Sequence, residues 1–364
     1  MTSESGVCII AEAGVNHNGS LDRALQMVDL AVDAGADYVK FQSFNAKRLV
    51  TKNASKADYQ KKQTDVSESQ LQMLEALELS HDMHEVLISR CESKSIGFMS
   101  TPFDEGGVRY LAATLNLPVI KISSGDLTNP LVLSEASATG KNLVLSTGMG
   151  DMAEIELALG CLAFSASGET RVPSEKEALD AWQMPDLRAM IAERVTVLHC
   201  TTEYPTPYED VNLRAMNAIS TRFGVKVGYS DHTPGIWVPI AAVAMGATAI
   251  EKHFTLDRTL PGPDHAASLE PDELKQMIAD IRGVEVALGS GMKFPVPSEL
   301  KNIPIASKSV VAATEILAGD MFTLENLTVK RPGTGMSPMK LSELLGTISD
   351  RRYGPDDVIE RNIS

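Results

Sequence analysis

Two histidines in the second half of the chain have the setting of a metal site. His232 lies in the polar tip YSDHT that ends the apolar run 226–228, and His253 lies in the tip EKHF at the end of the run 247–251. A segment rich in Ala, Val and Ile separates them and predicts a crossover helix between two parallel strands. The carboxyl ends of such strands face the same way, so both neutral imidazoles are expected to converge on a divalent metal. The alternative is two unrelated histidines that cap strands by hydrogen bonding.

Polar residues near the ends of earlier apolar runs suggest an anionic substrate. Lys40 and Lys121 supply positive charge. The loops 123–126 (SSGD) and 146–151 (STGMGD) place hydroxyl groups and glycines at the starts of helices, where backbone N–H groups and the helix dipole favour phosphate. Together, these lysines and loops predict a phosphate site. Other polar residues at equivalent positions include Glu12, Gln42, Thr101, Thr202, Tyr204, Ser230 and Glu251.

Lysines on barrel strands also allow a second kind of chemistry. A Schiff-base aldolase uses a desolvated lysine of lowered pKa as its nucleophile. Two lysines that face a common anion would keep their charge, and a metal polarises a carbonyl without a covalent intermediate. A cysteine nucleophile is disfavoured, because Cys200 directly follows His199 and neighbouring side chains of a strand point to opposite faces. The metal-assisted reaction is therefore preferred, with the aldolase as an alternative.

The elements that must position these residues alternate regularly before residue 290. Ser20 and Gly35 bracket a first amphipathic helix, and the same alternation of apolar run and helix recurs eight times. The predicted strands are 7–12, 36–41, 97–100, 118–122, 142–146, 195–198, 226–228 and 247–251, and the last helix covers 270–289. Eight such units predict a (β/α)8 TIM barrel over residues 1–289, with the site at the carboxyl ends of its strands.

Three further segments depart from this alternation. Residues 165–186 are polar and rich in turn residues, which predicts a mobile surface excursion of unassigned role. Residues 290–304 contain three prolines and predict a linker, followed by a small β-rich domain over 305–364. His81 and His84 are expected on the surface of a helix.

Composition narrows the classes of function. A formal charge of −15 argues against binding to nucleic acid, and no apolar run is long enough to span a membrane. The N-terminus has no signal-peptide pattern. The four cysteines (Cys8, Cys91, Cys161 and Cys200) are widely spaced without a CxxC pair, so they are expected to be reduced thiols in a cytoplasmic protein.

Taken in order, the motifs of the chain resemble those of the sialic acid synthase family. They are IIAEAGVNHNGS (9–20), VKFQ (39–42), STPFDE (100–105), IKISSGD (120–126), LSTGM (145–149), LHCTTEYPTPYEDVNL (198–213), GYSDHT (228–233), EKHFT (251–255) and PGPDHAASL (261–269). The segment VKRPGTGMSP (329–338) resembles the antifreeze-like (SAF) domain of that family. The resemblance covers nearly the whole chain and includes bacterial members that make legionaminic or pseudaminic acids from other N-acylated sugars.

The resemblance implies a reaction and a set of roles. The family condenses phosphoenolpyruvate with N-acetylmannosamine or a related 2-acylamino hexose, forming a nine-carbon 2-keto acid and phosphate. The metal, Mn2+ with Mg2+ or Co2+ as alternatives, would be bound by His232 and His253, and Glu12 would guide water or shuttle a proton. The implied phosphoenolpyruvate contacts are Lys40, Thr101, Lys121, Ser124, Asp126, Ser146, Thr202 and Ser230. The implied sugar contacts are Gln42, Gln63, Tyr204, Asp264 and Arg331.

In this family the SAF domain caps the barrel of a partner chain, which implies a domain-swapped homodimer with Arg331 on the N-acyl group of the sugar. The alternative for Arg331 is a surface ion pair. Three positions depart from the family pattern: Thr202 stands where some members have asparagine, Asp126 where some have glutamate, and Gln63 where a sugar-contacting asparagine is expected. These departures leave the reaction type intact and the exact sugar open. A non-catalytic sugar-binding barrel is the alternative from another class.

Overall fold

The computed structural model describes residues 6–64 and 68–360 and divides the chain into two compact units. The first unit extends to Gly289 and the second begins at Ser290. Each unit has its own hydrophobic core and is described by itself.

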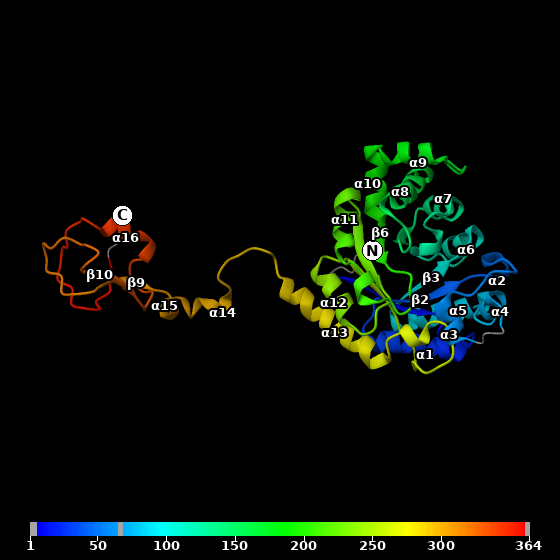
Figure 1. The fold of residues 1–364 in the computed structure, drawn as a ribbon, viewed down its shortest axis with the longest axis horizontal. Coiled ribbons are helices and arrows are strands. Elements are labelled where there is room, and N and C mark those ends of the chain that lie inside the picture. The colour runs from blue at the N-terminus through cyan, green and yellow to red at the C-terminus, as the bar shows by residue number, and fades with distance from the viewer. Residues whose placement is uncertain (1–5, 65–67, 361–364) are drawn as a thin grey trace. The chain divides into compact units, whose positions relative to one another are not determined.

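The first unit is a barrel of eight parallel strands surrounded by helices, as predicted (Figure 1). The strands are β1 (Cys8–Gly14), β2 (Tyr38–Ser43), β3 (Gly97–Pro102), β4 (Val119–Ile122), β5 (Asn142–Ser146), β6 (Val195–Cys200), β7 (Lys226–Asp231) and β8 (Ala249–His253). Hydrogen bonds connect them in the order β3-β2-β1-β8-β7-β6-β5-β4, and β3 also lies next to β4. Strands β7 and β8, which lead to His232 and His253, are direct neighbours.

The α-helices of the first unit mostly cover the outside of the barrel. They are α1 (Leu21–Ala34), α2 (Ala46–Leu49), α3 (Asp58–Gln63), α4 (Gln70–Glu75), α5 (His81–Lys94), α6 (Glu105–Arg109), α7 (Pro130–Ala138), α8 (Met152–Ala166), α9 (Glu175–Trp182), α10 (Pro185–Arg194), α11 (Arg214–Phe223), α12 (Trp237–Ala244) and α13 (Pro271–Leu288). Helix α1 begins as predicted, with the Ser20 side chain accepting from the Arg23 N–H. It ends at Gly35, whose φ of 86° is the left-handed conformation that glycine tolerates.

Two expectations about the outer layer were wrong. Residues 165–186 were expected to form a mobile excursion, but they contain α9, whose Trp182 is buried against Phe223 (6.3 Å between ring centroids). Figure 1 shows α8, α9 and α10 grouped on one side of the barrel. His84 is also buried rather than exposed, because it lies beneath β2 and forms a short hydrogen bond with Ser43 Oγ (2.5 Å). His81 is exposed, as expected.

The second unit is small and β-containing. Strand β9 (Ser309–Ala312) pairs antiparallel with β10 (Leu327–Lys330), and a core around Phe322 and Tyr353 supports them. Three short helices accompany these strands: α14 (Pro297–Leu300) and α15 (Ile303–Ala306), which fall largely within the predicted linker, and α16 (Leu341–Leu344).

Two composition-based expectations concern the described part of the chain. All four cysteines are free and buried, as predicted. Among the described residues, no helix has the length and apolar character needed to cross a membrane.

Candidate active site

A cavity of about 640 Å³ opens at the carboxyl ends of the barrel strands. It brings together fourteen of the sixteen residues to which the family resemblance gave a role. They are Glu12, Lys40, Gln42, Thr101, Lys121, Ser124, Asp126, Ser146, Thr202, Tyr204, Ser230, His232, His253 and Asp264. These residues come from all eight strands or from the loops that directly follow them, which explains why the strand ends were the informative positions.

Two predicted site residues lie elsewhere. Gln63 is exposed on α3 and is not among the described residues that line the cavity, whereas Tyr59 and Gln60 of the same helix are. The helix turns Gln63 to another face, so the structure does not bring this predicted sugar contact to the cavity. Arg331 belongs to the second unit, where its side chain is exposed and its Nε donates to Ala306 O (3.0 Å).

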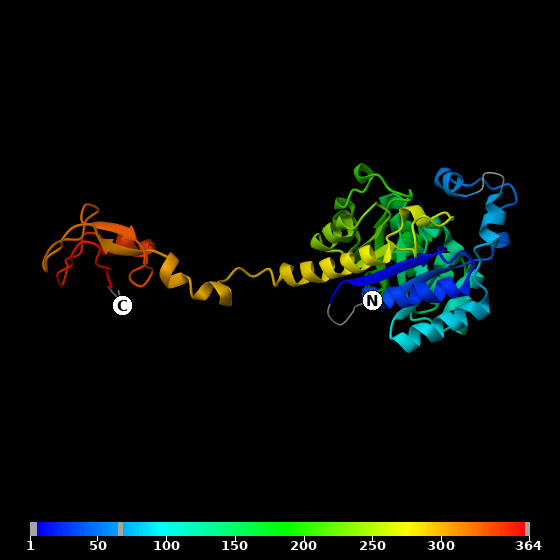
Figure 2. The same cartoon turned by 90° about the horizontal axis from the view of Figure 1, so that it is seen from below.

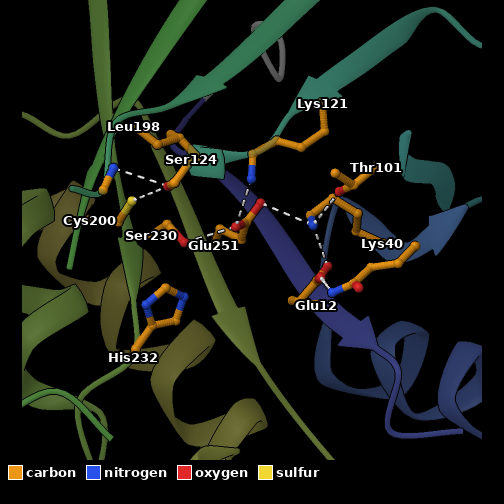
Figure 3. A network of polar contacts seen from close by, with 12 residues as sticks. Glu12, Lys40, Thr101, Lys121, Ser124, Leu198, Cys200, Ser230, His232 and Glu251 are labelled. Carbon is orange, nitrogen blue, oxygen red and sulfur yellow. Dashed lines mark hydrogen bonds and ion pairs between the residues drawn. The ribbon is translucent and has the colours of Figure 1, made fainter. Parts of the chain in front are cut away.

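Glu251 is the centre of the polar network at the base of the cavity (Figure 3). Its Oε1 accepts from Lys121 Nζ (3.1 Å) and from Ser230 Oγ (2.8 Å), and its Oε2 lies 3.5 Å from Lys40 Nζ. Lys40 in turn forms an ion pair with Glu12 Oε2 at 2.6 Å and donates to Thr101 Oγ1. Two lysines and two glutamates, all with nearly fully buried side chains, therefore balance each other's charge.

The sequence had placed Glu251 among the polar residues at the strand ends without giving it a role. Its position two residues before His253 on the same strand was the available signal, because side chains two apart on a strand share a face. The sequence could not show which residue pairs with Glu251, because Lys121 lies 130 residues away along the chain.

Burial and charge act against each other on the carboxylates of this network. Burial raises the pKa of Glu12 to about 7, although Lys40 acts in the opposite direction. Burial would also raise the pKa of Glu251, but Lys121 and Lys40 together lower it, so this carboxylate stays ionised. The two glutamates therefore differ in protonation near neutral pH, and Glu12 is the one that can exchange a proton.

The lysines respond to the same balance. Burial lowers the pKa of Lys121, with Glu251 opposing the shift. For Lys40, burial is outweighed by Glu12 and Glu251, and its pKa is raised. Lys40 therefore stays protonated, whereas the protonation of Lys121 depends on an anionic neighbour.

The loops after β4, β5 and β6 form a cradle of small donors. Ser124 Oγ accepts from the Gly148 N–H (3.0 Å) and lies 3.2 Å from Cys200 Sγ, as Figure 3 shows in part. A Cβ at Gly148 would lie 2.3 Å from Thr202 Oγ1, so only glycine permits this close approach. Ser146 Oγ is buried without a hydrogen-bond partner among the described residues, which leaves a donor for a bound anion.

Asp126 is held at the edge of this cradle. Its carboxylate accepts from Ser123 Oγ (2.6 Å) and from Asn129 Nδ2 (2.9 Å). Burial raises its pKa, and these two hydrogen bonds oppose the shift. Its side chain therefore orders the loop after β4 as well as lining the cavity.

His232 and His253 converge at the other side of the cavity. Their ring centroids are 5.4 Å apart. His232 Nδ1 donates to Thr201 O (2.7 Å), which fixes the tautomer and leaves Nε2 with a free lone pair. Burial lowers the pKa of His232 to about 4 and that of His253 well below its usual range, so both rings are neutral. Neutral imidazoles are the form that binds a metal.

The residues present fit a metal with an incomplete protein shell. His253 Nδ1 is buried without a hydrogen-bond partner among the described residues, and Asp264 Oδ2 lies 3.9 Å from it. Burial raises the pKa of Asp264 to about 6. Within residues 6–64 and 68–360, no group of three or more acidic, histidine or cysteine side chains is arranged to hold a metal. Two imidazoles would need oxygen ligands from substrate or water to complete a coordination shell.

Aromatic and apolar side chains form the outer wall of the cavity. Tyr59 of α3 packs on Tyr204 (5.0 Å between centroids), and Tyr204 packs on His232 (4.1 Å). Beside them, the buried Val15, Met73 and Leu77 form a separate apolar cluster that lines the cavity. Figure 2 shows the segment carrying α2, α3 and α4 protruding from the body of the barrel. The residue that this segment contributes to the aromatic stack is Tyr59.

The family model for the NeuB family matches residues 27–293, and the model for the SAF domain matches residues 307–360. The first match covers most of the chain and includes β2 to β8. The chain belongs to the NeuB family. The sequence-based resemblance to sialic acid synthases is thereby confirmed, as is the SAF domain.

Curated relatives and solved structures agree with this family. The chain is 46% identical to N,N'-diacetyllegionaminic acid synthase of Campylobacter jejuni over 351 residues, covering 96% of this chain and 98% of the relative. It is 42% identical to the N,N'-diacetyllegionaminic acid synthase of Legionella pneumophila, covering 93% and 89%. Among solved structures, the N-acetylneuraminic acid synthetase of Leptospira borgpetersenii matches with a TM-score of 0.68 and 32% identity, covering 82% of this NeuB-family chain and 90% of that one.

Proposed function

We propose that the protein is a nonulosonic acid synthase that condenses phosphoenolpyruvate with a 2-acylamino hexose. The observation that carries the proposal is one cavity that holds two buried lysines and a hydroxyl cradle, which suit a phosphate ester, beside two neutral histidines, which suit a divalent metal. A bond forms between C3 of phosphoenolpyruvate and the aldehyde carbon of the open-chain sugar. Water adds to C2, the bond from C2 to the phosphate oxygen breaks, and a nine-carbon 2-keto acid and phosphate leave.

The lysines and the cradle bind phosphoenolpyruvate in this proposal. Lys40 and Lys121 neutralise its carboxylate and phosphate, while the hydroxyl groups of Ser124 and Ser146 donate to its oxygens, with Ser124 held by the Gly148 N–H. Glu251 keeps both lysines in place before the substrate arrives, because it contacts both ammonium groups. Such preorganised donors stabilise developing charge without reorganisation at the moment of reaction.

Glu12 moves the proton in this reaction. Its raised pKa lets it accept a proton from the attacking water near neutral pH, and Lys40 at 2.6 Å stabilises the carboxylate form. Gln42 Nε2 lies 3.5 Å from the other oxygen of Glu12 and helps to fix its orientation. Glu251 stays ionised and is therefore less suited to the same role.

The histidines provide the metal site of this proposal. His232 and His253 would hold Mn2+, with Mg2+ or Co2+ as alternatives, and the ion would make the sugar aldehyde more electrophilic. The contribution of the chain is to keep both rings neutral and to fix His232 through Thr201. Tyr204 packs on both rings and holds their spacing.

The sugar we propose is a 2,4-diacetamido-trideoxyhexose, the substrate type of legionaminic acid synthases, with N-acetylmannosamine second and the pseudaminic-type isomer third. Two relatives above 40% identity are named N,N'-diacetyllegionaminic acid synthase. The apolar wall of Val15, Met73 and Leu77 supports this choice, because a trideoxy sugar with two acetamido groups presents more methyl surface than N-acetylmannosamine.

The experiment that tests the reaction is release of phosphate in the presence of phosphoenolpyruvate, Mn2+ and a panel of 2-acylamino hexoses. We expect phosphate and a 2-keto acid in equal amounts, with the diacetamido sugar giving the highest kcat/KM. Failure with every sugar of the panel would overturn the proposal. Activity that survives EDTA, together with borohydride trapping at Lys121, would instead favour the Schiff-base aldolase.

We also propose that Arg331 of one chain completes the sugar site of a partner chain in a domain-swapped homodimer. Its exposed guanidinium lies in a separate compact unit, which supports a role outside that unit. Mixing Arg331→Ala protein with His253→Ala protein tests this idea. In a swapped dimer, exchange restores about a quarter of the sites, because half of the dimers are mixed and each has one intact site. No recovery after exchange would show that Arg331 acts on its own barrel or not at all.

A cytoplasmic location is our proposal for the compartment. Four free, buried thiols suit a reducing environment, in which disulfides rarely persist.

A further inference from the structure

The carboxyl ends of β7 and β8 are joined by an ion pair on the face opposite the cavity. Lys252 Nζ lies 2.5 Å from Asp231 Oδ2, and both side chains are 0% exposed. Neither residue is among the described residues that line the cavity. Asp231 directly precedes His232, and Lys252 directly precedes His253, so the pair connects the residues next to both imidazoles.

The pair also fixes the backbone on the far side of His232. Asp231 Oδ1 accepts from the Thr233 N–H (3.0 Å), and its Oδ2 accepts from Thr233 Oγ1 (3.0 Å). Lys252 Nζ donates to Thr233 O in addition to its contact with Asp231. Because Asp231 and Lys252 are also register partners in the sheet, one buried cluster sets both the register of the strands and the path of the chain around His232.

A buried ion pair is an expensive way to join two strands. Removing two charges from water costs several kcal/mol each, and apolar residues of similar volume often stabilise a fold equally well or better. Stability alone therefore does not account for the cluster. What an ion pair adds over apolar contact is a fixed direction and distance, and a metal site with only two protein ligands depends on the spacing between them.

We propose that Asp231, Lys252 and Thr233 form a positioning cluster that sets the spacing of His232 and His253 for metal binding. The proposal rests on the proposed metal site and goes beyond it, because these three residues touch neither metal nor substrate. They act through the backbone of the two histidines. Loss of the cluster should therefore weaken metal binding while the chemistry at saturating metal is largely retained.

The test uses the full-length double variant Asp231→Asn, Lys252→Met, which removes both charges without leaving one of them unpaired. Mn2+ affinity is measured from the electron paramagnetic resonance signal of free Mn2+, and the Mn2+ concentration for half-maximal phosphate release is measured separately. We expect the Kd for Mn2+ and the half-maximal Mn2+ concentration both to rise about 10–100-fold, the range typical of residues that orient metal ligands, with kcat at saturating Mn2+ within about threefold of the parent. Unchanged Mn2+ affinity in the folded variant would overturn the proposal.

Two further variants keep the result interpretable. Ser137→Ala removes buried hydrogen bonds to Leu162 O and Arg194 elsewhere in the outer layer, so it controls for general destabilisation and should leave Mn2+ affinity unchanged. If the double variant does not fold cooperatively, Thr233→Val removes only the hydroxyl contact with Asp231. It should weaken Mn2+ binding in the same direction by a smaller factor, and an affinity within twofold of the parent overturns the proposal.

The parent protein and His253→Ala separate this inference from the metal site itself. Mn2+ binding that is present in the parent and lost in His253→Ala establishes the site, whatever the double variant shows. Equal binding by the parent and His253→Ala would mean that the proposed metal site is wrong, and the positioning cluster would fall with it.

Discussion

Replacing Glu12 with glutamine removes the carboxylate of the Lys40–Glu251 network whose pKa lies near 7. Burial raises that pKa to about 7, and the carboxylate form is stabilised by Lys40 at 2.6 Å. Glutamine keeps the size and can still accept a hydrogen bond from Lys40, but it cannot take a proton from water. The change therefore isolates proton transfer from packing.

The size of the expected effect follows from these values. General base catalysis contributes about 10²–10⁴-fold, so Glu12→Gln should lower kcat by that factor, which corresponds to about 3–5 kcal/mol of activation free energy. In the parent, a base with a pKa of about 7 is ionised roughly tenfold more at pH 8 than at pH 6. The kcat/KM of the free enzyme should fall by about that factor as the pH drops across this range.

The assay is continuous phosphate release between pH 5.5 and 9 with saturating Mn2+. Phosphoenolpyruvate has its own ionisation near pH 6, as phosphate monoesters do, so some acidic decline is expected in every variant. Only the additional decline centred near pH 7 should disappear in Glu12→Gln. Glu135→Gln, on the outer helix α7, is the matched control and should keep the parental profile. A Glu12→Gln enzyme within threefold of the parental kcat, or with an unchanged profile, would refute the reasoning.

Three other predictions concern the metal, the second unit and stability. His253→Ala should abolish Mn2+-dependent turnover while thermal unfolding stays cooperative, and normal turnover would show that the ligand assignment is wrong. Arg331→Ala should raise KM for the sugar by a factor equivalent to about 1.5–3 kcal/mol of binding free energy, as expected for loss of one charge-assisted hydrogen bond. The KM for phosphoenolpyruvate should stay nearly unchanged, and equal effects on both KM values would contradict the role of Arg331. Burial lowers the pKa of His17 to about 4, so the unfolded state binds the extra proton between pH 6.5 and 4 and stability is lost as pH falls. In denaturant unfolding, the unfolding free energy of His17→Asn should fall by up to about 3 kcal/mol less than that of the parent between pH 6.5 and 4. If the unfolding free energy of the variant depends on pH as steeply as that of the parent, His17 is excluded as the source of the loss.

The positions of the barrel strands were what the sequence predicted best, although six of the eight strands end two or three residues later than expected. Every strand of the barrel overlaps its predicted range, and the predicted β5 range, 142–146, coincides with the observed strand. The last residues of parallel barrel strands lie at the same end of the barrel, so a list of residues near the strand ends includes most of the residues that line the cavity. This is why Glu12, Lys121 and His253, far apart in the chain, were found by one rule.

The loops and the outer layer were harder to predict, because their contacts come from distant segments. Gln63 was chosen by its position in the loop after β2, but the short helix α3 directs Tyr59 and Gln60 to the cavity instead. A six-residue helix in a polar segment gives too little periodicity to reveal which face is buried. The burial of His84 depends on Ser43, 41 residues away, and the polar helix around it gave no sign of that contact.

Charge networks were also beyond the sequence. Glu251 was visible as a polar residue in a strand, yet its role depends on Lys40 and Lys121 arriving from two other strands. The same holds for Asp231 and Lys252, which precede the two histidines and pair only because β7 and β8 are neighbours in a particular register. Register is set by the whole barrel, so it cannot be read from either strand alone.

The most direct test of the central claim is a competition between sugars in one reaction. The protein is incubated with Mn2+, limiting phosphoenolpyruvate and equal concentrations of the 2,4-diacetamido-trideoxy sugar and N-acetylmannosamine, and the products are identified by mass spectrometry. We expect that phosphoenolpyruvate is consumed, that phosphate equals total 2-keto acid, and that the diacetamido product predominates. Predominance of N-acetylneuraminate would contradict the assignment of the apolar wall, and unconsumed phosphoenolpyruvate would contradict the synthase reaction itself.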